Sequence, residues 1–215
     1  MGKIVVTEWS ALDGVVEDPG GGEGFERGGW VFEIDQGDEG TTFKLDEALA
    51  SDALLLGRRT YENFAAAWPK RTGQWADKLN AVPKYVVSST LEDPTWHNTT
   101  VVGGELGDLG EQVTKIKRAH DGDITVHGST RLVRALLDRD LVDELRLMVF
   151  PVILGTGQRL FGPTSGKKAL RLVDSRTVGD GVTILVYEPA AGTTDDDHES
   201  NRETAFRRGG ISENA

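Results

Sequence analysis

Apolar and polar positions along the chain predict strands that alternate with helices. Residues 3–9 alternate in polarity and are rich in β-branched side chains, which predicts a first strand. Residues 53–56 form an unbroken apolar run, Ala-Leu-Leu-Leu, which is too short for a free helix and typical of a strand covered on both faces. Gly57 ends that run, and from Arg58 onward apolar residues recur at helical spacing.

The same alternation continues to residue 138 and then changes. Further strands are predicted at 84–88, 99–102 and 123–127, and helices at 41–50, 75–81, 109–119 and 131–138. A long strand at 145–154, which carries Pro151, and a hairpin of 169–178 and 182–188 around Gly179-Asp180-Gly181 follow. We therefore expect an α/β fold with a mostly parallel central sheet, helices on both faces and an antiparallel C-terminal addition.

Changes in composition suggest where the folded domain ends. Residues 190–215 are mostly Gly, Thr, Asp, Arg and Ser, so we expect one domain at 1–189 and a disordered acidic and polar tail at 190–215. Residues 15–40 are glycine-rich and acidic, yet they carry large apolar side chains such as Phe25 and Trp30. Such side chains favour an ordered lid or pocket wall over a disordered loop.

Composition excludes several classes of function. The chain has no cysteine and only four scattered histidines, so we expect neither a thiolate nucleophile nor a metal site. A formal charge of −11 argues against nucleic-acid binding, which needs a basic stripe. Apolar runs fall far short of the roughly 20 residues that span a bilayer, and no secretory signal is evident, so we expect a cytoplasmic protein without membrane contact.

Three predicted strand ends carry groups that suit phosphate. These segments are Gly57-Arg58-Arg59-Thr60, Ser88-Ser89-Thr90 and Gly128-Ser129-Thr130. Because parallel strands end at one edge of a sheet, the segments would join helix N-termini, hydroxyls and two guanidinium groups into a cradle for a molecule with several phosphates. A solvated surface turn with ordinary serine and threonine helix caps is the alternative, and it leaves the paired arginines unexplained.

For other candidate residues, the sequence is consistent with either a functional or a structural role. Asp13 follows the first strand, where its carboxyl could donate or relay a proton if burial raises its pKa, but Asp-Gly is equally typical of a plain turn. Glu23, Glu26 and Arg27 would line a substrate pocket or be solvated loop residues. Trp30 and Trp68 would be part of the pocket wall or core residues. His127 would face a ligand or simply end its strand. A Rossmann motif at 155–160 is rejected because its third glycine is missing.

Five segments together resemble the dihydrofolate-reductase-like family that includes the reductase domain of the bifunctional riboflavin-biosynthesis deaminase-reductase. They are Leu-Asp-Gly-Val-Val at 12–16, the strand–Gly-Arg-Arg-Thr–helix stretch at 52–62, His-Gly-Ser at 127–129, Leu-Val-Asp-Glu-Leu at 141–145, and Pro-Val-Ile-Leu-Gly-Thr-Gly at 151–157 with Leu-Phe at 160–161. The resemblance covers residues 2–189. It implies an NADPH-dependent reductase acting on a small molecule, and a homodimer formed through the C-terminal strands.

The resemblance also assigns roles to residues. Arg58, Arg59 and Thr60 would hold the NADPH phosphates, including the 2′-phosphate, and the serine turn would flank the adenosine. The cofactor-binding set it implies is Leu12, Gly57, Arg58, Arg59, Thr60, Ser88, Ser89, His127, Gly128, Ser129 and Thr130, with Asp13 catalytic and Glu26 and Trp30 at the substrate.

The chain also departs from that family. A deaminase half needs a cysteine-containing zinc motif, so we expect a stand-alone reductase-like domain. Ala11 stands where the family often has serine, and the acidic loop contrasts with a pocket for a phosphorylated ribose. The reaction expected is hydride transfer to a C=N or C=O carbon of a heterocyclic or sugar-derived substrate, most like 5-amino-6-(5-phosphoribosylamino)uracil reduction. A non-catalytic or regulatory NADPH-binding module is the alternative.

Overall fold

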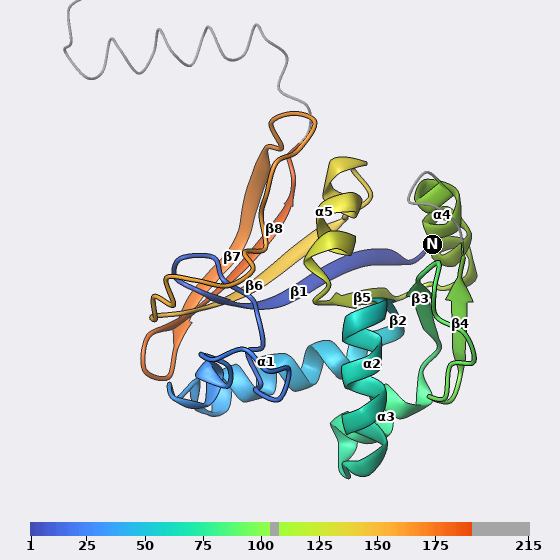
Figure 1. Ribbon diagram of the computed structural model, residues 1–215. Coiled ribbons are helices and arrows are strands. Elements are labelled where there is room, and N and C mark those ends of the chain that lie inside the picture. Colours follow the sequence, from blue (N-terminus) through green and yellow to red (C-terminus); the bar gives the residue numbers. More distant parts are fainter. Residues whose placement is uncertain (104–107, 191–215) are drawn as a thin grey trace, which may run out of the picture.

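The computed structural model describes residues 1–103 and 108–190 (Figure 1). In chain order its elements are β1 (Lys3–Ala11), η1 (Trp30–Phe32), α1 (Gly37–Ala50), β2 (Ser51–Gly57), α2 (Arg58–Ala67), η2 (Trp68–Lys70), α3 (Gln74–Ala81), β3 (Lys84–Val87), β4 (Thr99–Val102), α4 (Leu109–Ala119), β5 (Asp123–His127), α5 (Thr130–Asp138), β6 (Glu144–Phe150), β7 (Leu170–Val178) and β8 (Val182–Pro189).

One twisted sheet of eight strands organises the described part of the chain. Its order is β4-β3-β2-β5-β1-β6-β8-β7, with β1 paired in parallel to both β5 and β6. β8 runs antiparallel to β6 and to β7, whereas every other pair is parallel. The predicted fold class, a mostly parallel sheet with an antiparallel C-terminal addition, is confirmed.

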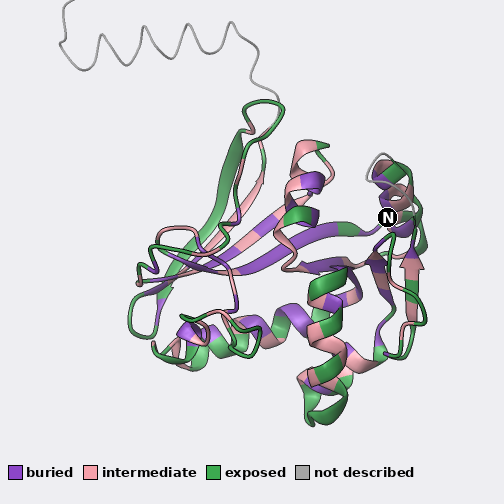
Figure 2. Cartoon of the chain, in the orientation of Figure 1, coloured by how far each residue is buried: buried purple, intermediate pink, exposed green. Residues whose placement is uncertain are grey.

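Helices cover the two faces of the sheet, which explains why β2 is apolar at successive positions. Leu55 packs in a cluster with residues of α4 and α5, whereas Leu54 and Leu56 pack in a separate cluster with residues of α2 and α3. The burial of β2 along its length is visible in Figure 2. All three leucines are fully buried. Burying a leucine side chain contributes about 1.5–3 kcal/mol, so a strand buried on both faces is well anchored.

Some boundaries differ from the sequence prediction for identifiable reasons. β6 ends at Phe150 instead of residue 154, because Pro151 has no N–H to continue the ladder and the chain then turns through a Val152 N–H to Phe150 carbonyl bond of 2.8 Å. α1 begins four residues earlier than expected, at Gly37. Of the predicted tail at 190–215, residues 191–215 lie outside the described part of the chain.

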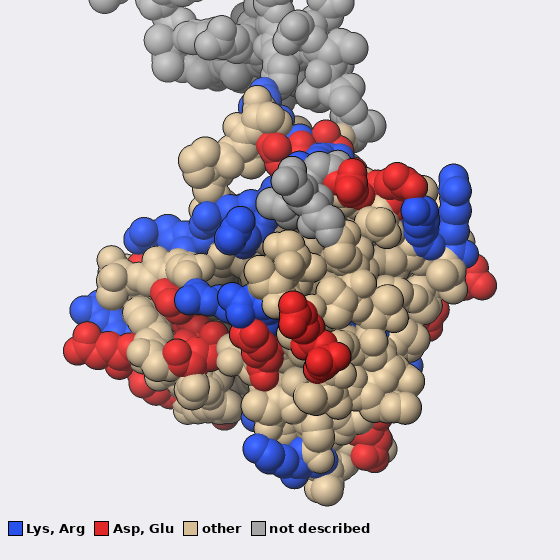
Figure 3. All heavy atoms as spheres, turned by 45° about the vertical axis from the view of Figure 1, so that its right-hand side comes forward, with Lys and Arg blue, Asp and Glu red and all other residues tan. Residues whose placement is uncertain are grey.

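The surface carries both signs of charge. On the face in Figure 3, lysine and arginine side chains are interspersed with aspartate and glutamate, without a continuous basic stripe. Within 1–103 and 108–190, no helix combines the length and apolar character needed to cross a membrane.

Candidate functional site

A large cleft opens at the carboxyl ends of the parallel strands. Its volume is about 1950 Å³, and it lies where β2, β3 and β5 end and beside Thr7, Glu8 and Trp9 of β1, between α1, α2 and α3 and beneath residues 16–23. This is the sheet edge to which the sequence assigned the three polar strand ends. Residues from all three of these segments line the cleft.

At one end of the cleft, two helices begin side by side. α2 starts directly after Gly57 and α5 directly after Ser129, and the Thr60 and Ser129 hydroxyl oxygens lie 3.2 Å apart. A Cβ on Gly57 would overlap the Ser129 hydroxyl, and a Cβ on Gly128 would lie 3.0 Å from the Thr60 hydroxyl, so the glycines permit this close approach. Both Gly128 and Ser129 have φ near +59°, which makes the turn left-handed.

These helix starts are open to an anion. Within the described residues no side chain caps either helix, so Ser129 does not act as the ordinary cap that the alternative interpretation supposed. Uncapped N–H groups at a helix N-terminus favour negative charge, and two helices contribute here.

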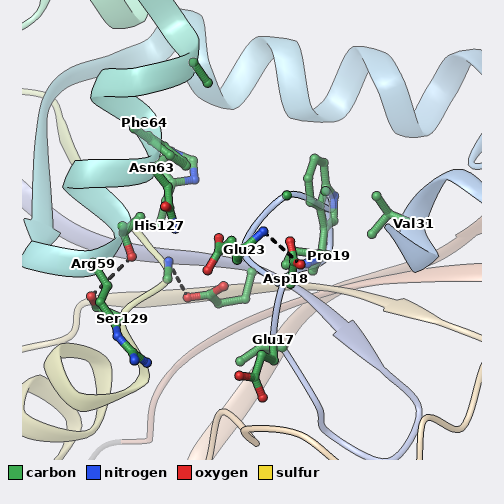
Figure 4. Close-up of a pocket in the computed structure, with 18 of the residues that line it drawn as sticks. Glu17, Asp18, Pro19, Glu23, Val31, Arg59, Asn63, Phe64, His127 and Ser129 are labelled. Carbon is green, nitrogen blue, oxygen red and sulfur yellow. Dashed lines mark hydrogen bonds between the residues drawn. The ribbon is translucent and has the colours of Figure 1, made fainter. Parts of the chain in front are cut away.

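Two arginines stand at the start of α2. Arg58 is half-exposed and pairs with Glu62 of the same helix at 3.0 Å. Arg59 lines the cleft and, among the described residues, makes no ion pair within 4 Å; Figure 4 shows it beside Ser129. Ser88 and Ser89 also line the cleft, but the Ser88 hydroxyl accepts the N–H groups of the next turn, at 2.9 and 3.1 Å.

Glu8, which sequence reasoning missed, borders the Gly128 turn from β1. The last register pair between β1 and β5 is Thr7 with His127, so Glu8 lies just past the end of β5. Its carboxyl accepts the Gly128 N–H at 2.7 Å and is only 6% exposed. Burial raises the pKa of Glu8 to about 8, against the lowering effects of that hydrogen bond and of the Lys44 charge, so the carboxyl is largely protonated at neutral pH.

Lys44 and His127 also line the cleft, but the charge of Lys44 is paired with a carboxylate and His127 is uncharged. The Lys44 ammonium lies 2.6 Å from the Glu47 carboxylate and 2.6 Å from the Thr7 hydroxyl, all three buried. Burial, helped by Lys44, lowers the pKa of His127 to about 3, so its imidazole is neutral. The Nε2 atom of His127 is buried and has no hydrogen-bond partner among the described residues.

The glycine-rich loop forms an acidic wall of the cleft. Asp18 is buried and accepts the backbone N–H groups of Glu23 and Phe25 at 3.0 and 3.3 Å, which orders the loop (Figure 4). Burial, and then the neighbouring Asp18 charge, raise the pKa of Glu23. Glu17 lines the same wall.

Asp13 lies outside the residues that line the cleft. Its carboxylate accepts the N–H groups of Gly155 and Leu154 at 2.8 and 3.4 Å and lies 3.6 Å from the Arg159 guanidinium. Partial burial opposes ionisation, but these hydrogen bonds and the arginine outweigh it and lower the pKa of Asp13. The raised pKa that a proton donor would need is therefore absent, and the contacts are those of a loop anchor.

Three other predicted site residues also stand apart from the cleft lining. Leu12 is 63% exposed and its N–H bonds to the Val152 carbonyl. Glu26 is exposed. Trp30 is 1% exposed, meets the edge of Phe150 at 5.5 Å between ring centroids and donates its indole N–H to the loop, so it is a core residue.

Comparison with known proteins shows which family and which proteins the chain is similar to. A family model described as the RibD C-terminal domain matches residues 2–184. Uncharacterized protein YyaP of Bacillus subtilis (strain 168) is 30% identical over 141 residues, 63% of this chain and 73% of that protein.

Solved structures share the fold. A pyrimidine reductase-like protein from Corynebacterium diphtheriae superposes with a TM-score of 0.61 at 16% identity, covering 89% of this chain and 93% of that one. Dihydrofolate reductase from Enterococcus faecalis, complexed with NADP(H), superposes with a TM-score of 0.54 at 14% identity, covering 88% and 98%. The predicted dihydrofolate-reductase-like fold is confirmed.

Proposed function

The chain belongs to the RibD C-terminal domain family, and we propose that it is an NADPH-dependent reductase. Family and fold are reductase-like. The proposed reaction transfers hydride to a C=N or C=O carbon of a small heterocyclic or sugar-derived substrate. Within the family, the reaction most like it is reduction of 5-amino-6-(5-phosphoribosylamino)uracil.

One observation carries the proposal: two uncapped helix N-termini and two arginines converge at one end of the cleft. NADPH carries a pyrophosphate and a 2′-phosphate, and Arg59 faces that end without a partner carboxylate within 4 Å among the described residues. Gly57 allows the Thr60 and Ser129 hydroxyls to lie 3.2 Å apart at this end of the cleft. Both hydroxyls are therefore placed beside the proposed position of the phosphate oxygens. The residues present therefore fit the cofactor.

Each part of the cleft takes a role in this proposal. Arg58, Arg59 and Thr60 hold the phosphates, and the Ser88-Ser89 turn flanks the adenosine. Gly128, Ser129 and Thr130 lie beneath the pyrophosphate and the nicotinamide. Bound NADPH supplies the hydride, while the protein orients the reactants and excludes water. The NADP(H) complex of the E. faecalis enzyme supports the use of this fold for a nicotinamide cofactor.

The substrate end is reassigned in this proposal. Glu26 and Trp30 do not line the cleft, whereas Glu23 of the same loop does, together with Trp9 and Phe64. Half-buried aromatic rings beside carboxyl groups suit a planar heterocycle with hydrogen-bonding edges.

A homodimer is part of the proposal. β7 forms the edge of the sheet, and all its residues but the last are exposed, including Leu170, Leu172 and Val173. A long exposed edge strand with apolar side chains is a template for pairing with another chain, and a second copy would cover it.

The experiment is a fluorescence titration with NADPH. We expect low-micromolar binding or tighter by the wild-type protein, weakened at least tenfold, about 1.4 kcal/mol, in the double variant Arg58→Ala/Arg59→Ala. Arg118→Ala, an exposed arginine of α4 that does not line the cleft, is the matched control and should bind like the wild type. Absence of NADPH binding would refute the reductase proposal. Binding without turnover of any heterocyclic substrate would favour the non-catalytic module.

A further inference from the structure

Glu8 occupies an unusual position for a charged residue. It lies in the middle of β1, a strand covered on both faces. Its side chain nevertheless reaches the cleft, because β5 ends at His127, which pairs with Thr7, the residue before Glu8. One carboxyl oxygen accepts the Gly128 N–H at 2.7 Å. The carboxyl therefore adjoins the turn that, in the proposed function, lies beneath the nicotinamide.

The surroundings of Glu8 keep a proton on it. Burial raises the pKa of Glu8 to about 8, and the cation that opposes this shift, Lys44 of α1, is already paired with Glu47. His127 of β5 is neutral because its pKa is about 3. The other charged side chains that line the cleft are Glu17, Asp18, Glu23, Glu33, Asp35, Arg58, Arg59, Arg71, Arg131 and Asp180.

Other groups are less suited to deliver a proton. Asp13 lies outside the cleft lining with its pKa lowered. His127 has lost its proton well below neutral pH. Glu23 also has a raised pKa, but it stands on the glycine-rich loop, and it is the Glu8 carboxyl that accepts the Gly128 N–H.

We propose that Glu8 is the catalytic acid of the cleft, which gives its proton to the substrate atom next to the carbon that receives hydride. The inference rests on the proposed reductase function. The O–H bond of Glu8 breaks and an N–H or O–H bond forms on the substrate. The electron pair that takes the proton is released from the C=N or C=O bond as the nicotinamide hydride adds to its carbon. The Glu8 carboxylate then regains a proton from water in the cleft.

A purely structural role makes a different prediction. If Glu8 only anchored the Gly128 turn at a distance from the nicotinamide, its ionisation would differ little between bound NADP⁺ and bound NADPH, because the effect of one charge on a distant ring is screened. NADP⁺ and NADPH differ by one positive charge on that ring. Comparing the ionisation of Glu8 with NADP⁺ bound and with NADPH bound therefore tests whether Glu8 lies beside the nicotinamide. The comparison needs no substrate.

The test is an infrared titration of protein labelled with ¹³C at the glutamate carboxyl groups. In the wild type we expect a neutral-carboxyl band that disappears with a midpoint near pH 8 and is missing in Glu8→Gln, whose amide oxygen can still accept the Gly128 N–H. Glu23→Gln is the matched control and should keep this band. Should Glu8→Gln fail to fold, Glu8→Asp removes the labelled carboxyl while retaining an acid.

The same titration is repeated with saturating NADPH and with saturating NADP⁺. We expect the midpoint to be at least one pH unit lower with NADP⁺, because the ring cation stabilises the adjacent carboxylate. Equal midpoints with both cofactors bound, or a band that survives Glu8→Gln, would overturn the assignment of Glu8 and leave the reductase proposal standing. If neither cofactor binds, the reductase proposal itself fails, and this one with it.

Discussion

Replacing Glu8 with glutamine should change how the stability of the protein depends on pH. The pKa of Glu8 is about 8 in the folded protein, against an ordinary value of 4.5. Because the folded-state pKa is the higher of the two, the folded protein holds a proton that the unfolded chain releases. The stabilisation linked to that proton is fully present below pH 4.5 and is lost as pH rises through about 8.

The size of the effect follows from the two pKa values. They are about 3.5 pH units apart, and each unit corresponds to about 1.4 kcal/mol, so the wild type should lose up to about 5 kcal/mol between pH 4.5 and pH 9 through Glu8 alone. Glu8→Gln cannot ionise and should lack this loss. Its free energy of unfolding, relative to the wild type, should therefore rise steadily across that range.

The assay is urea unfolding of both proteins at unit pH steps from 5 to 9. Other groups such as His127 and Lys84 titrate in both proteins, so their effects cancel in the difference between wild type and variant. Glu92→Gln removes an exposed acid and should run parallel to the wild type. If Glu8→Gln also runs parallel to the wild type, Glu8 is not protonated in the folded state and the reasoning about its burial is refuted.

The remaining predictions concern packing, anchoring and assembly. Gly57→Ala should destabilise the protein by about 1–3 kcal/mol and weaken NADPH binding at least tenfold, because the new Cβ overlaps the Ser129 hydroxyl; wild-type affinity would contradict this. Trp30→Ala should cost about 3–5 kcal/mol of stability in urea unfolding, since the ring is buried in the core. Asp13→Asn should lower the melting temperature at pH 7 by an amount that shrinks as pH falls below 3.8, with NADPH affinity unchanged, because the pKa of Asp13 is lowered and its carboxylate anchors a loop. Leu172→Lys should convert a dimer to monomer in light scattering, since Leu172 is 48% exposed on the edge strand; an unchanged mass would exclude that edge as the interface.

Local patterns were enough to predict most elements of the fold. The strand–glycine–helix pattern at Gly57 and again at Gly128 placed two helix starts at one sheet edge, and both line the cleft. The strand order did not follow from the sequence, since it depends on pairings such as β1 with β5, about 120 residues apart.

Side-chain direction was the part that local patterns could not supply. Asp13 was assigned to the site from its place after β1, but Gly155, 142 residues later, provides the N–H that turns its carboxylate away. Glu8 was passed over because a polar residue in an alternating strand looks solvent-facing. An ionisable residue between Thr7 and Trp9, in a strand buried on both faces, was the available sign of a functional carboxyl. It could be interpreted only once the end of β5 was known.

The most direct test of the cofactor assignment is a crystal structure of the protein with NADPH. We predict that the 2′-phosphate lies within hydrogen-bonding distance of Arg58 or Arg59, and that the pyrophosphate lies between the N-termini of α2 and α5. The nicotinamide should then lie beside Gly128 and Glu8. A cofactor bound in the reverse direction, with its nicotinamide at the arginines, or bound outside this cleft would contradict the assignment.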